Sequence, residues 1–362
     1  MSFHPELPYN DLPDLPPPVE LETKPVLKRV IAATRALAEL KGVGGAIPDQ
    51  RILVNGVVLQ EARASSEIEN IVTTTDELYR ALDESFAGAS PSAKEVLRYR
   101  EALWHGSSTL SERPIDTGLM VEIASTIRQT DAGIRNTPGT RIAPPFGETI
   151  YTPPEGEDRI RGKLRNLEEF ILADNGVDAL VKLAVMHYQF EAIHPFADGN
   201  GRTGRVLNIL YLVERGLLDL PVLYLSGFIL ERRGQYYDLL RQVTEEGAWE
   251  DWLLYVLEAV EVTATDTRQR ILDIRGLMED ALARAKEAGL HAARQDMIDL
   301  IFRQPYCKIG FVVDAGIVSR GLASDYLRQL ESLGLLSSVR KGRVVYYINE
   351  PLVDVLKRPL GA

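Results

Sequence analysis

A glycine-rich segment near the middle of the chain collects residue types that phosphate chemistry needs. Residues 194–205 read HPFADGNGRTGR. The imidazole of His194 can take a proton from a hydroxyl group near neutral pH. Asp198 offers a hard oxygen ligand for Mg²⁺ bound to a polyphosphate. The segment therefore supplies a candidate general base and a candidate metal ligand four residues apart.

The same segment can also bind phosphate oxygens directly. Three residues that tolerate unusual backbone angles precede a helix expected from Thr203: Gly199, Asn200 and Gly201. Backbone N–H groups that converge before a helix form an anion-binding nest. Arg202 and Arg205 add forked donors for phosphate oxygens. A single histidine or a single glycine-rich loop would more simply be structural, but their combination indicates a phosphate-transfer site.

Helical periodicity dominates the rest of the chain and predicts a mainly α fold. Helices are expected over residues 25–40, 51–70, 92–112, 117–129, 157–173, 177–193, 226–246 and 249–289. Thr75 is the expected N-cap of a further helix. Prolines between residues 5 and 18 predict an extended arm instead. We expect four regions: an N-terminal helical region (1–110), a catalytic core (111–260), a helical linker (261–291) and a C-terminal module (292–362).

Residues 134–156 interrupt the helical pattern just before the glycine-rich segment in the expected core. Their proline pairs exclude a helix, and the alternation around Glu148–Thr152 suggests a short β-hairpin or flap at about 145–152.

The C-terminal module reads as three helices followed by a two-stranded wing that turns at Lys341 and Gly342. This order predicts a winged helix-turn-helix. Residues 292–349 carry eight basic and five acidic side chains, whereas the whole chain has a net charge of −11. Both DNA binding and protein docking stay open for this module, because its excess of positive charge is modest.

Composition limits the class of protein. The hydrophobic fraction of 45% is that of a globular protein. No apolar stretch approaches the roughly 20 residues that a membrane span needs, so no membrane partner is expected. The first residues lack a secretion signal, and the single cysteine, Cys307, excludes an intrachain disulfide. A cytoplasmic location is the default expectation.

The segment 194–205 resembles the HxFx(D/E)GNGRxxR signature of the Fic (Fic/DOC) family, and the resemblance covers about residues 10–260. It implies an all-α core in which His194 deprotonates a Ser, Thr or Tyr hydroxyl that attacks the α-phosphorus of ATP. By the same resemblance, Asp198 binds Mg²⁺, residues 199–201 hold the phosphates with Arg202, and Arg205 reaches the γ-phosphate. Two tyrosines, Tyr236 and Tyr237, would help form the adenine pocket. The target protein would add a strand to a flap made of Gly147, Glu148, Thr149, Ile150 and Tyr151.

Residues 65–70, SSEIEN, resemble the inhibitory helix motif of the same family, (S/T)xxxE(G/N). Ser65, Glu69 and Asn70 stand at its defined positions. The resemblance implies that Glu69 pairs with Arg205 and denies it to ATP, which makes Glu69 part of the nucleotide site. In some members this glutamate also supports removal of AMP. The alternative is a solvated, glutamate-rich helix face.

The expected activity is protein adenylyltransfer, with ATP and Mg²⁺ as co-substrate and cofactor. Two alternatives remain: a Fic-fold transferase of UMP, phosphate or phosphocholine, and a DNA-binding regulator that senses nucleotide. The intact Gly-Asn-Gly nest favours attack at an α-phosphate, and a sensor would need no base at position 194. The target could be the chain itself. Family members often form homodimers, but the sequence indicates no interface.

Overall fold

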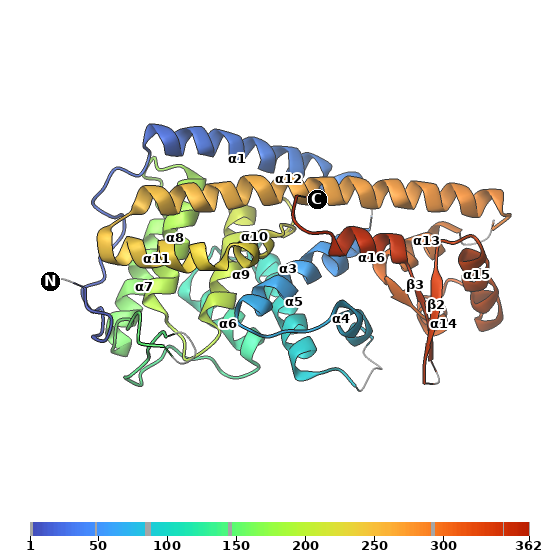
Figure 1. The fold of residues 1–362 in the computed structure, drawn as a ribbon, viewed down its shortest axis with the longest axis horizontal. Helices are drawn as coiled ribbons and strands as arrows, with labels where there is room; N and C mark the ends of the chain where they lie inside the picture. The colour runs from blue at the N-terminus through green and yellow to red at the C-terminus, as the bar shows by residue number, and fades with distance from the viewer. Residues whose placement is uncertain are drawn as a thin grey trace.

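A computed structural model describes residues 3–47, 49–83, 88–143, 147–290, 294–342 and 344–361. The fold is mainly α, as predicted (Figure 1). In the N-terminal region the helices are α1 (Lys24–Val43), a 3-10 turn (Gly44–Ala46), α2 (Arg51–Leu53), a π-helical stretch (Val54–Val58), α3 (Leu59–Ile68), α4 (Thr75–Ala81) and α5 (Pro91–Thr109). The expected core contains α6 (Thr117–Arg128), α7 (Glu157–Leu172), α8 (Ala179–Ile193), α9 (Asn200–Glu214), α10 (Leu225–Glu231) and α11 (Arg233–Glu246), and α12 (Trp249–Glu287) follows.

The two outermost long helices, α1 and α12, run side by side along one edge of the molecule (Figure 1). The apolar residues that predicted α1 are all buried: Val26, Val30, Ala33, Leu37 and Leu40. At 1.5 Å per residue, the 39 residues of α12 span about 58 Å. This helix continues unbroken through residue 260, so the expected core and linker share one element.

Helices α8 and α9 lie at the centre and carry the glycine-rich segment between them. Nearly every residue of α8 is buried, because the helix is apolar on all sides and is packed by α7, α9 and α12. Helices α5 and α6 pack against α9. The loop at residues 194–199 is thus fixed at both ends by fully packed helices.

Several expected boundaries differ from the structure for local reasons. Thr74, not Thr75, caps α4, because its side chain accepts from the Glu77 N–H while Glu77 bonds back to Thr74. The expected helix over 226–246 is divided at Arg232 into α10 and α11. Helix α9 begins at Asn200 rather than near Thr203, so the nest residues form its first turn.

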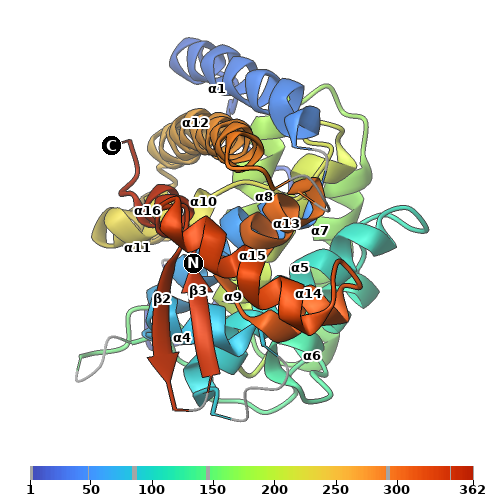
Figure 2. The same ribbon diagram turned by 90° about the vertical axis from the view of Figure 1, so that its right-hand side faces the viewer.

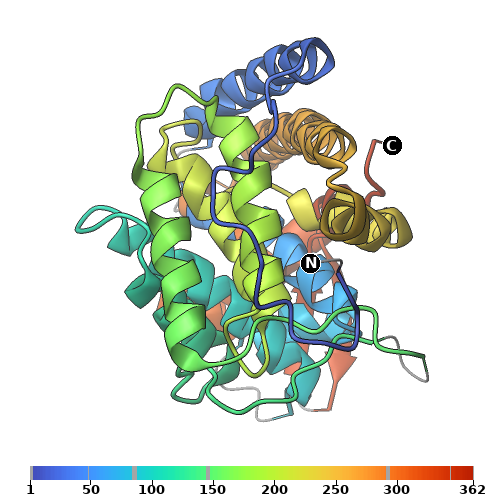
Figure 3. The same ribbon diagram turned by 90° about the vertical axis from the view of Figure 1, so that its left-hand side faces the viewer.

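The N-terminal arm is extended, as its prolines predicted, and crosses the end of the molecule that Figure 3 presents. The Tyr9 N–H donates to the Thr152 carbonyl at 2.9 Å, and the Thr152 hydroxyl donates to the Pro5 carbonyl at 2.6 Å. The ring of Phe3 stacks on Tyr151 at a centroid distance of 5.9 Å. The arm therefore lies against the segment expected to form the flap.

The C-terminal module contains α13 (Arg294–Arg303), β1 (Tyr306–Cys307), α14 (Ile309–Asp314), α15 (Arg320–Ser332), β2 (Ser337–Lys341), β3 (Val344–Ile348) and α16 (Glu350–Lys357). The strands form an antiparallel sheet in the order β1-β3-β2, and α14 and α15 lie beside β2 and β3 in Figure 2. This order of helices and hairpin is consistent with a winged helix-turn-helix. Arg343, expected on the wing, lies outside the described residues.

A buried arginine in the middle of α12 holds the end of the chain. Arg270 pairs with Asp266 at 2.5 Å. Its guanidinium also donates to the carbonyls of Val355, Leu356 and Arg358 at 2.8, 3.1 and 2.6 Å. The side chain is only 2% exposed, so these acceptors replace water entirely. Among the described residues, no helix is long and apolar enough to cross a membrane.

Candidate functional site

His194 ends α8 in a left-handed conformation, with φ 49° and ψ 60°. A non-glycine residue adopts this conformation only when its surroundings fix it. Arg135 provides that constraint, because its guanidinium donates to the carbonyls of His194 at 2.7 Å, Pro154 at 2.5 Å and Ile193 at 3.2 Å. His194 is therefore placed by a buried arginine that sequence reasoning did not identify.

The environment of His194 keeps its imidazole neutral. Burial and the nearby Arg135 charge lower the pKa of His194 to about 4, below its ordinary value near 6.5. The Nδ1 atom is buried, and a hydrogen bond with the Glu191 backbone is among the interactions that act on the His194 pKa. A neutral imidazole keeps one unprotonated ring nitrogen, which can accept a proton from a hydroxyl brought to it.

The first turn of α9 has the geometry of an anion site. Gly199 takes the left-handed conformation, with φ 84°, and lets the chain turn into the helix. The Asn200 side chain accepts from the Phe196 N–H and donates to the Phe196 carbonyl, both at 2.8 Å. The amide of Asn200 thus braces the loop, while the N–H groups of the first helical turn have no partner within the helix.

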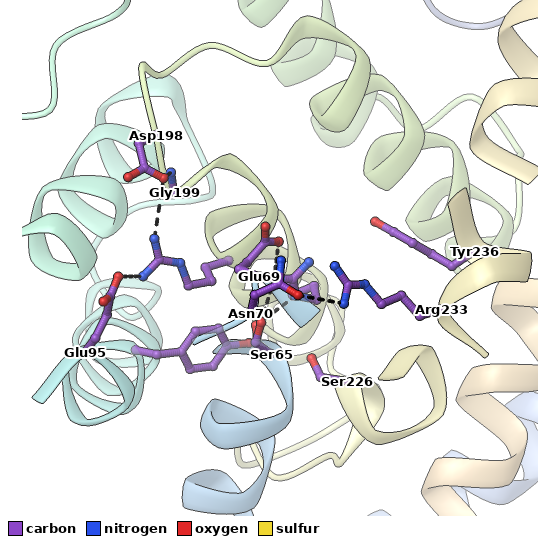
Figure 4. A network of polar contacts seen from close by, with 12 residues as sticks. Ser65, Glu69, Asn70, Glu95, Asp198, Gly199, Ser226, Arg233 and Tyr236 are labelled. Carbon is purple, nitrogen blue, oxygen red and sulfur yellow. Dashed lines mark hydrogen bonds and ion pairs between the residues drawn. The ribbon is translucent and has the colours of Figure 1, made fainter. Parts of the chain in front are cut away.

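The three predicted inhibitory residues lie together (Figure 4), and two of them, Ser65 and Glu69, bond to Arg205. Arg205 donates to the Ser65 hydroxyl at 2.8 Å, to the Ser65 carbonyl at 2.9 Å and to Glu69 Oε1 at 2.8 Å. Burial works to raise the pKa of Glu69, but the charges of Arg205 and Arg202 outweigh it and hold this pKa below its ordinary value. Glu69 is therefore an ionised carboxylate at neutral pH.

Asn70 follows the end of α3 in a left-handed conformation, with φ 62°, which explains an asparagine at this position. Its side-chain oxygen accepts from Arg233 at 3.1 Å (Figure 4). The helix carrying Ser65 and Glu69 is thus tied to α11 as well as to α9.

Arg202 is paired with acidic side chains instead of being free to bind phosphate oxygens, as had been expected. Its side chain is 2% exposed, contacts Glu95 of α5 and lies 3.6 Å from Asp198. Asp198 also contacts Arg128, and its carboxylate is half exposed. Arg202 therefore connects the loop at Asp198 to Glu95 of α5, because a buried guanidinium group needs acidic partners.

A cleft of about 820 Å³, including the part open to solvent, joins these groups. Its lining includes His194, Gly201, Arg205, Glu69, Tyr236, Tyr237, Ile150 and Tyr151, together with Phe3, Ile142, Tyr188, Glu191, Ala192, Leu240, Arg241 and Thr244. Within the described chain, Asp198, Gly199, Asn200 and Arg202 are not part of that lining. The Tyr236 hydroxyl is fixed by His187 Nε2 at 2.9 Å, whereas Tyr237 is 37% exposed.

The expected flap is a single antiparallel bridge between Ile142 and Tyr151 rather than a hairpin of regular strands. Ile142 donates to the Tyr151 carbonyl at 2.8 Å and accepts from the Ile150 N–H at 2.9 Å. Gly147 and Glu148 are exposed, and Thr149 is partly exposed. Residues 145 and 146 of the expected flap lie outside the described residues.

Four residues of the site were not predicted: Glu95, Arg128, Arg135 and Glu191. The first three lie far in sequence from the partners they hold, so no local pattern reveals them. Glu191 could have been found, since it stands one helical turn before His194 and shares its helix face.

A magnesium ion at Asp198 would take the place of an existing ion pair and bring most of its other ligands with it. The Asp198 carboxylate is half exposed but already contacts Arg128 and the Gly199 N–H, and the described residues contain no group of three or more His, Cys, Asp or Glu side chains that could hold a metal ion. Mg²⁺ commonly binds through one or two carboxylates, water and substrate phosphates.

The chain matches three family models. The Fic/DOC family N-terminal model matches residues 27–108, and the Fic/DOC family model matches residues 114–212. The model of the C-terminal domain of SoFic-like protein adenylyltransferase matches residues 277–352.

Relatives and solved structures are similar to the chain over different lengths. A probable protein adenylyltransferase of Aquifex aeolicus is 29% identical over 195 residues, which cover 52% of this chain and 55% of that protein. Protein adenylyltransferase Fic of Aedes aegypti is 39% identical over 84 residues, 23% of this chain and 15% of that protein. The match thus spans about half the length of the first relative and less of the second.

A Fic family protein from Desulfovibrio desulfuricans has the same fold, with a TM-score of 0.55 at 17% identity over 92% of this chain and 98% of that one. Fic-1 from C. elegans gives a TM-score of 0.52 at 19% identity, over 71% and 74% of the two chains. With the three domain models matched in order, this chain belongs to the Fic/DOC family.

Proposed function

We propose that this protein transfers AMP from ATP to a hydroxyl group of a protein, and that Glu69 holds it in an inhibited state. The observation that carries the proposal is the Glu69–Arg205 ion pair, at 2.8 Å, in the cleft that His194 also lines. A neutral imidazole, an open first helical turn and an engaged arginine are the parts of a restrained phosphate-transfer site. The names of the relatives, protein adenylyltransferases, support the same reaction.

In this reaction His194 takes the proton of the target hydroxyl, and the oxygen of that hydroxyl forms a bond to the α-phosphorus of ATP. The bond between the α-phosphorus and the bridging oxygen to the β-phosphate breaks, and pyrophosphate leaves with that oxygen. The N–H groups at Asn200 and Gly201 would face the phosphate oxygens, and Arg205 would bind the terminal phosphate once Glu69 has moved. Mg²⁺, held through Asp198, would neutralise phosphate charge when bound.

Two tyrosines supply the other end of the nucleotide site. Tyr236 and Tyr237 lie 5.1 Å apart between ring centroids, in an edge-to-face arrangement, and both line the cleft. Aromatic faces bind adenine by stacking. The half-exposed Tyr237 ring would meet the base, while Tyr236 forms the wall behind it.

The target segment would lie along residues 147–151. Exposed backbone at this edge can pair with an added strand, a mode that selects little sequence. The chain itself is a candidate target, because its N-terminal arm already bonds to Thr152 beside this edge.

Glu69 would also serve the reverse reaction, removal of AMP. A carboxylate that stays ionised within reach of the first turn of α9 could orient water toward a protein-bound AMP.

Labelled ATP tests the proposal. The Glu69→Gly variant is incubated with Mg²⁺ and ATP labelled at the α- or γ-phosphate, and protein-bound label is measured. Adenylyltransfer predicts label only from the α position. Label from the γ position would indicate a kinase, and no label from either would leave only a nucleotide-binding role.

A second function, DNA binding, is favoured by one observation in the C-terminal module. Four exposed basic side chains lie on α15 and β2: Arg320, Arg328, Arg340 and Lys341. Full-length protein should bind duplex DNA at low salt, with affinity that falls as salt rises. Binding that is absent at low salt, or unchanged by Arg328→Glu, would assign this face to another partner.

A further inference from the structure

Glu191 is a carboxylate in the cleft for which the reaction above has no use. It lies in the last turn of α8, and its Oε1 is buried with no hydrogen-bond partner in the described part of the chain. The space for this oxygen depends on Gly204 of α9, because a Cβ there would overlap Oε1. A buried acceptor without a partner costs free energy in the unliganded protein, so a ligand that supplies a donor gains the difference.

Glu191 interacts with groups at both ends of the cleft that it lines. It stands three positions before His194, a rise of about 4.5 Å along the axis of α8. Its charge interacts with Arg205 and Glu69 at the phosphate end and with the Tyr236 hydroxyl at the other end. The next residue of α8 to line the same wall, Tyr188, bonds to Thr244 at 2.9 Å farther along α11.

A nucleotide bound with its α-phosphate at His194 and its base at Tyr237 must place its sugar between them. We propose that the Glu191 carboxyl group binds the ribose hydroxyls of the nucleotide and selects ribonucleotides over deoxyribonucleotides. This inference rests on the proposed function. It gives a binding partner to the ribose, which the phosphate and adenine contacts do not bind.

The chemistry of the pair is favourable on both sides. Ribose hydroxyls donate hydrogen bonds, and a carboxylate accepts them in the stronger, charge-assisted form. Burial raises the pKa of Glu191 to about 7, and hydroxyl donors would favour the ionised form. A site with a buried polar group rejects an analogue that lacks the matching hydroxyl, because the group is then left unpaired.

Nucleotide binding without turnover tests the assignment. The parent is Glu69→Gly combined with His194→Ala, which frees Arg205 and removes the base. Dissociation constants are measured by calorimetry at pH 8 for ATP, 2′-deoxy-ATP and 3′-deoxy-ATP. The parent should bind ATP about tenfold more tightly than at least one deoxy analogue. Adding Glu191→Leu should remove this preference, Glu191→Gln should keep part of it, and Tyr188→Phe, the control on the same wall, should keep all of it.

The outcomes separate this inference from the proposed function. A parent that binds ATP and its deoxy analogues equally, or a preference that survives Glu191→Leu, overturns the ribose assignment while AMP transfer by Glu69→Gly stands. If Glu69→Gly neither binds nor transfers AMP, the proposed function fails and the ribose assignment fails with it. A thermal unfolding midpoint matched to the parent shows that each Glu191 variant is folded.

Discussion

The carboxylate of Glu69 lies 2.8 Å from Arg205 Nη2, and a Cβ on Gly201 would overlap the same carboxylate oxygen. The Glu69 carboxylate therefore lies against the first turn of α9, and it fits there because Gly201 has no side chain. A phosphate group would bind to the same two features, the N–H groups of the first turn of α9 and the guanidinium of Arg205. Under the proposed function, Glu69 and a phosphate of the substrate would compete for one position.

Replacing Glu69 should release the enzyme. We expect Glu69→Gly to raise auto-modification by α-labelled ATP at least about tenfold, because Arg205 becomes available to the terminal phosphate. Intact mass should show added AMP. Glu67→Gly is the matched control, since it places the same flexible residue in the last turn of α3 and leaves the ion pair intact. Equal stimulation by both variants would mean that helix loosening, not the carboxylate, matters.

The pH dependence should report His194. Because its pKa is lowered to about 4, the imidazole is neutral at every pH well above that value. Removal of Glu69 takes away a charge that raises this pKa, so the Glu69→Gly variant shifts further in the same direction. At saturating ATP, where the bound nucleotide would hold Glu191 ionised, the kcat of this variant should be flat between pH 6 and 8 and fall only toward pH 4. A half-point of kcat near 6.5 would contradict the buried, neutral base.

Replacing His194 by alanine in this variant should abolish transfer. The control is His105→Ala, because His105 is exposed and pairs only with Glu122 at 3.3 Å in the described structure. Retained transfer without His194 would assign the base elsewhere.

The buried Arg202 should depend on Glu95 for stability. Glu95→Ala leaves a side chain that is 2% exposed with only the more distant Asp198 at 3.6 Å. We expect the free energy of unfolding to fall by about 2 kcal/mol, measured by urea denaturation. Glu101→Ala, at an exposed position of the same helix, should change it by less than about 0.5 kcal/mol. If Glu95→Ala lowers the free energy of unfolding no more than the Glu101→Ala control does, Arg202 has found another partner.

Metal removal should stop transfer by the Glu69→Gly variant, and Asp198→Asn should raise the Mg²⁺ concentration needed for half-maximal rate about tenfold. Asp131→Asn, at an exposed position beyond α6, is the control. Unchanged Mg²⁺ dependence in Asp198→Asn would place the metal ligand elsewhere.

Local periodicity predicted the helices, and the resemblance of two short motifs to those of the family implied the contact between Glu69 and Arg205. The mainly α fold was confirmed, because amphipathic and fully apolar helices leave a strong periodic signal. The flap was predicted only in outline, since one bridge at Ile142 replaces the expected hairpin.

The orientation of Arg202 could not be read from the sequence. Its neighbours in the motif suggested a phosphate ligand, yet its partner Glu95 comes from a helix about a hundred residues earlier. Arg135 could not be predicted either. It binds backbone carbonyl oxygens, which every residue has, so no residue type marks its partners in the sequence. Long-range partners of buried arginines are set by packing and not by spacing.

The hydrogen bonds from Arg270 to the C-terminal residues have a practical consequence for deletion experiments. Cutting the protein before α13 would remove the carbonyls at residues 355, 356 and 358 and leave the guanidinium beside Asp266 and the Tyr224 ring. A shortened protein would then expose the part of α12 that α16 covers. Loss of activity on truncation would consequently report damage to α12, and point substitutions on the outer face of α15 are the cleaner way to ask what the tail contributes.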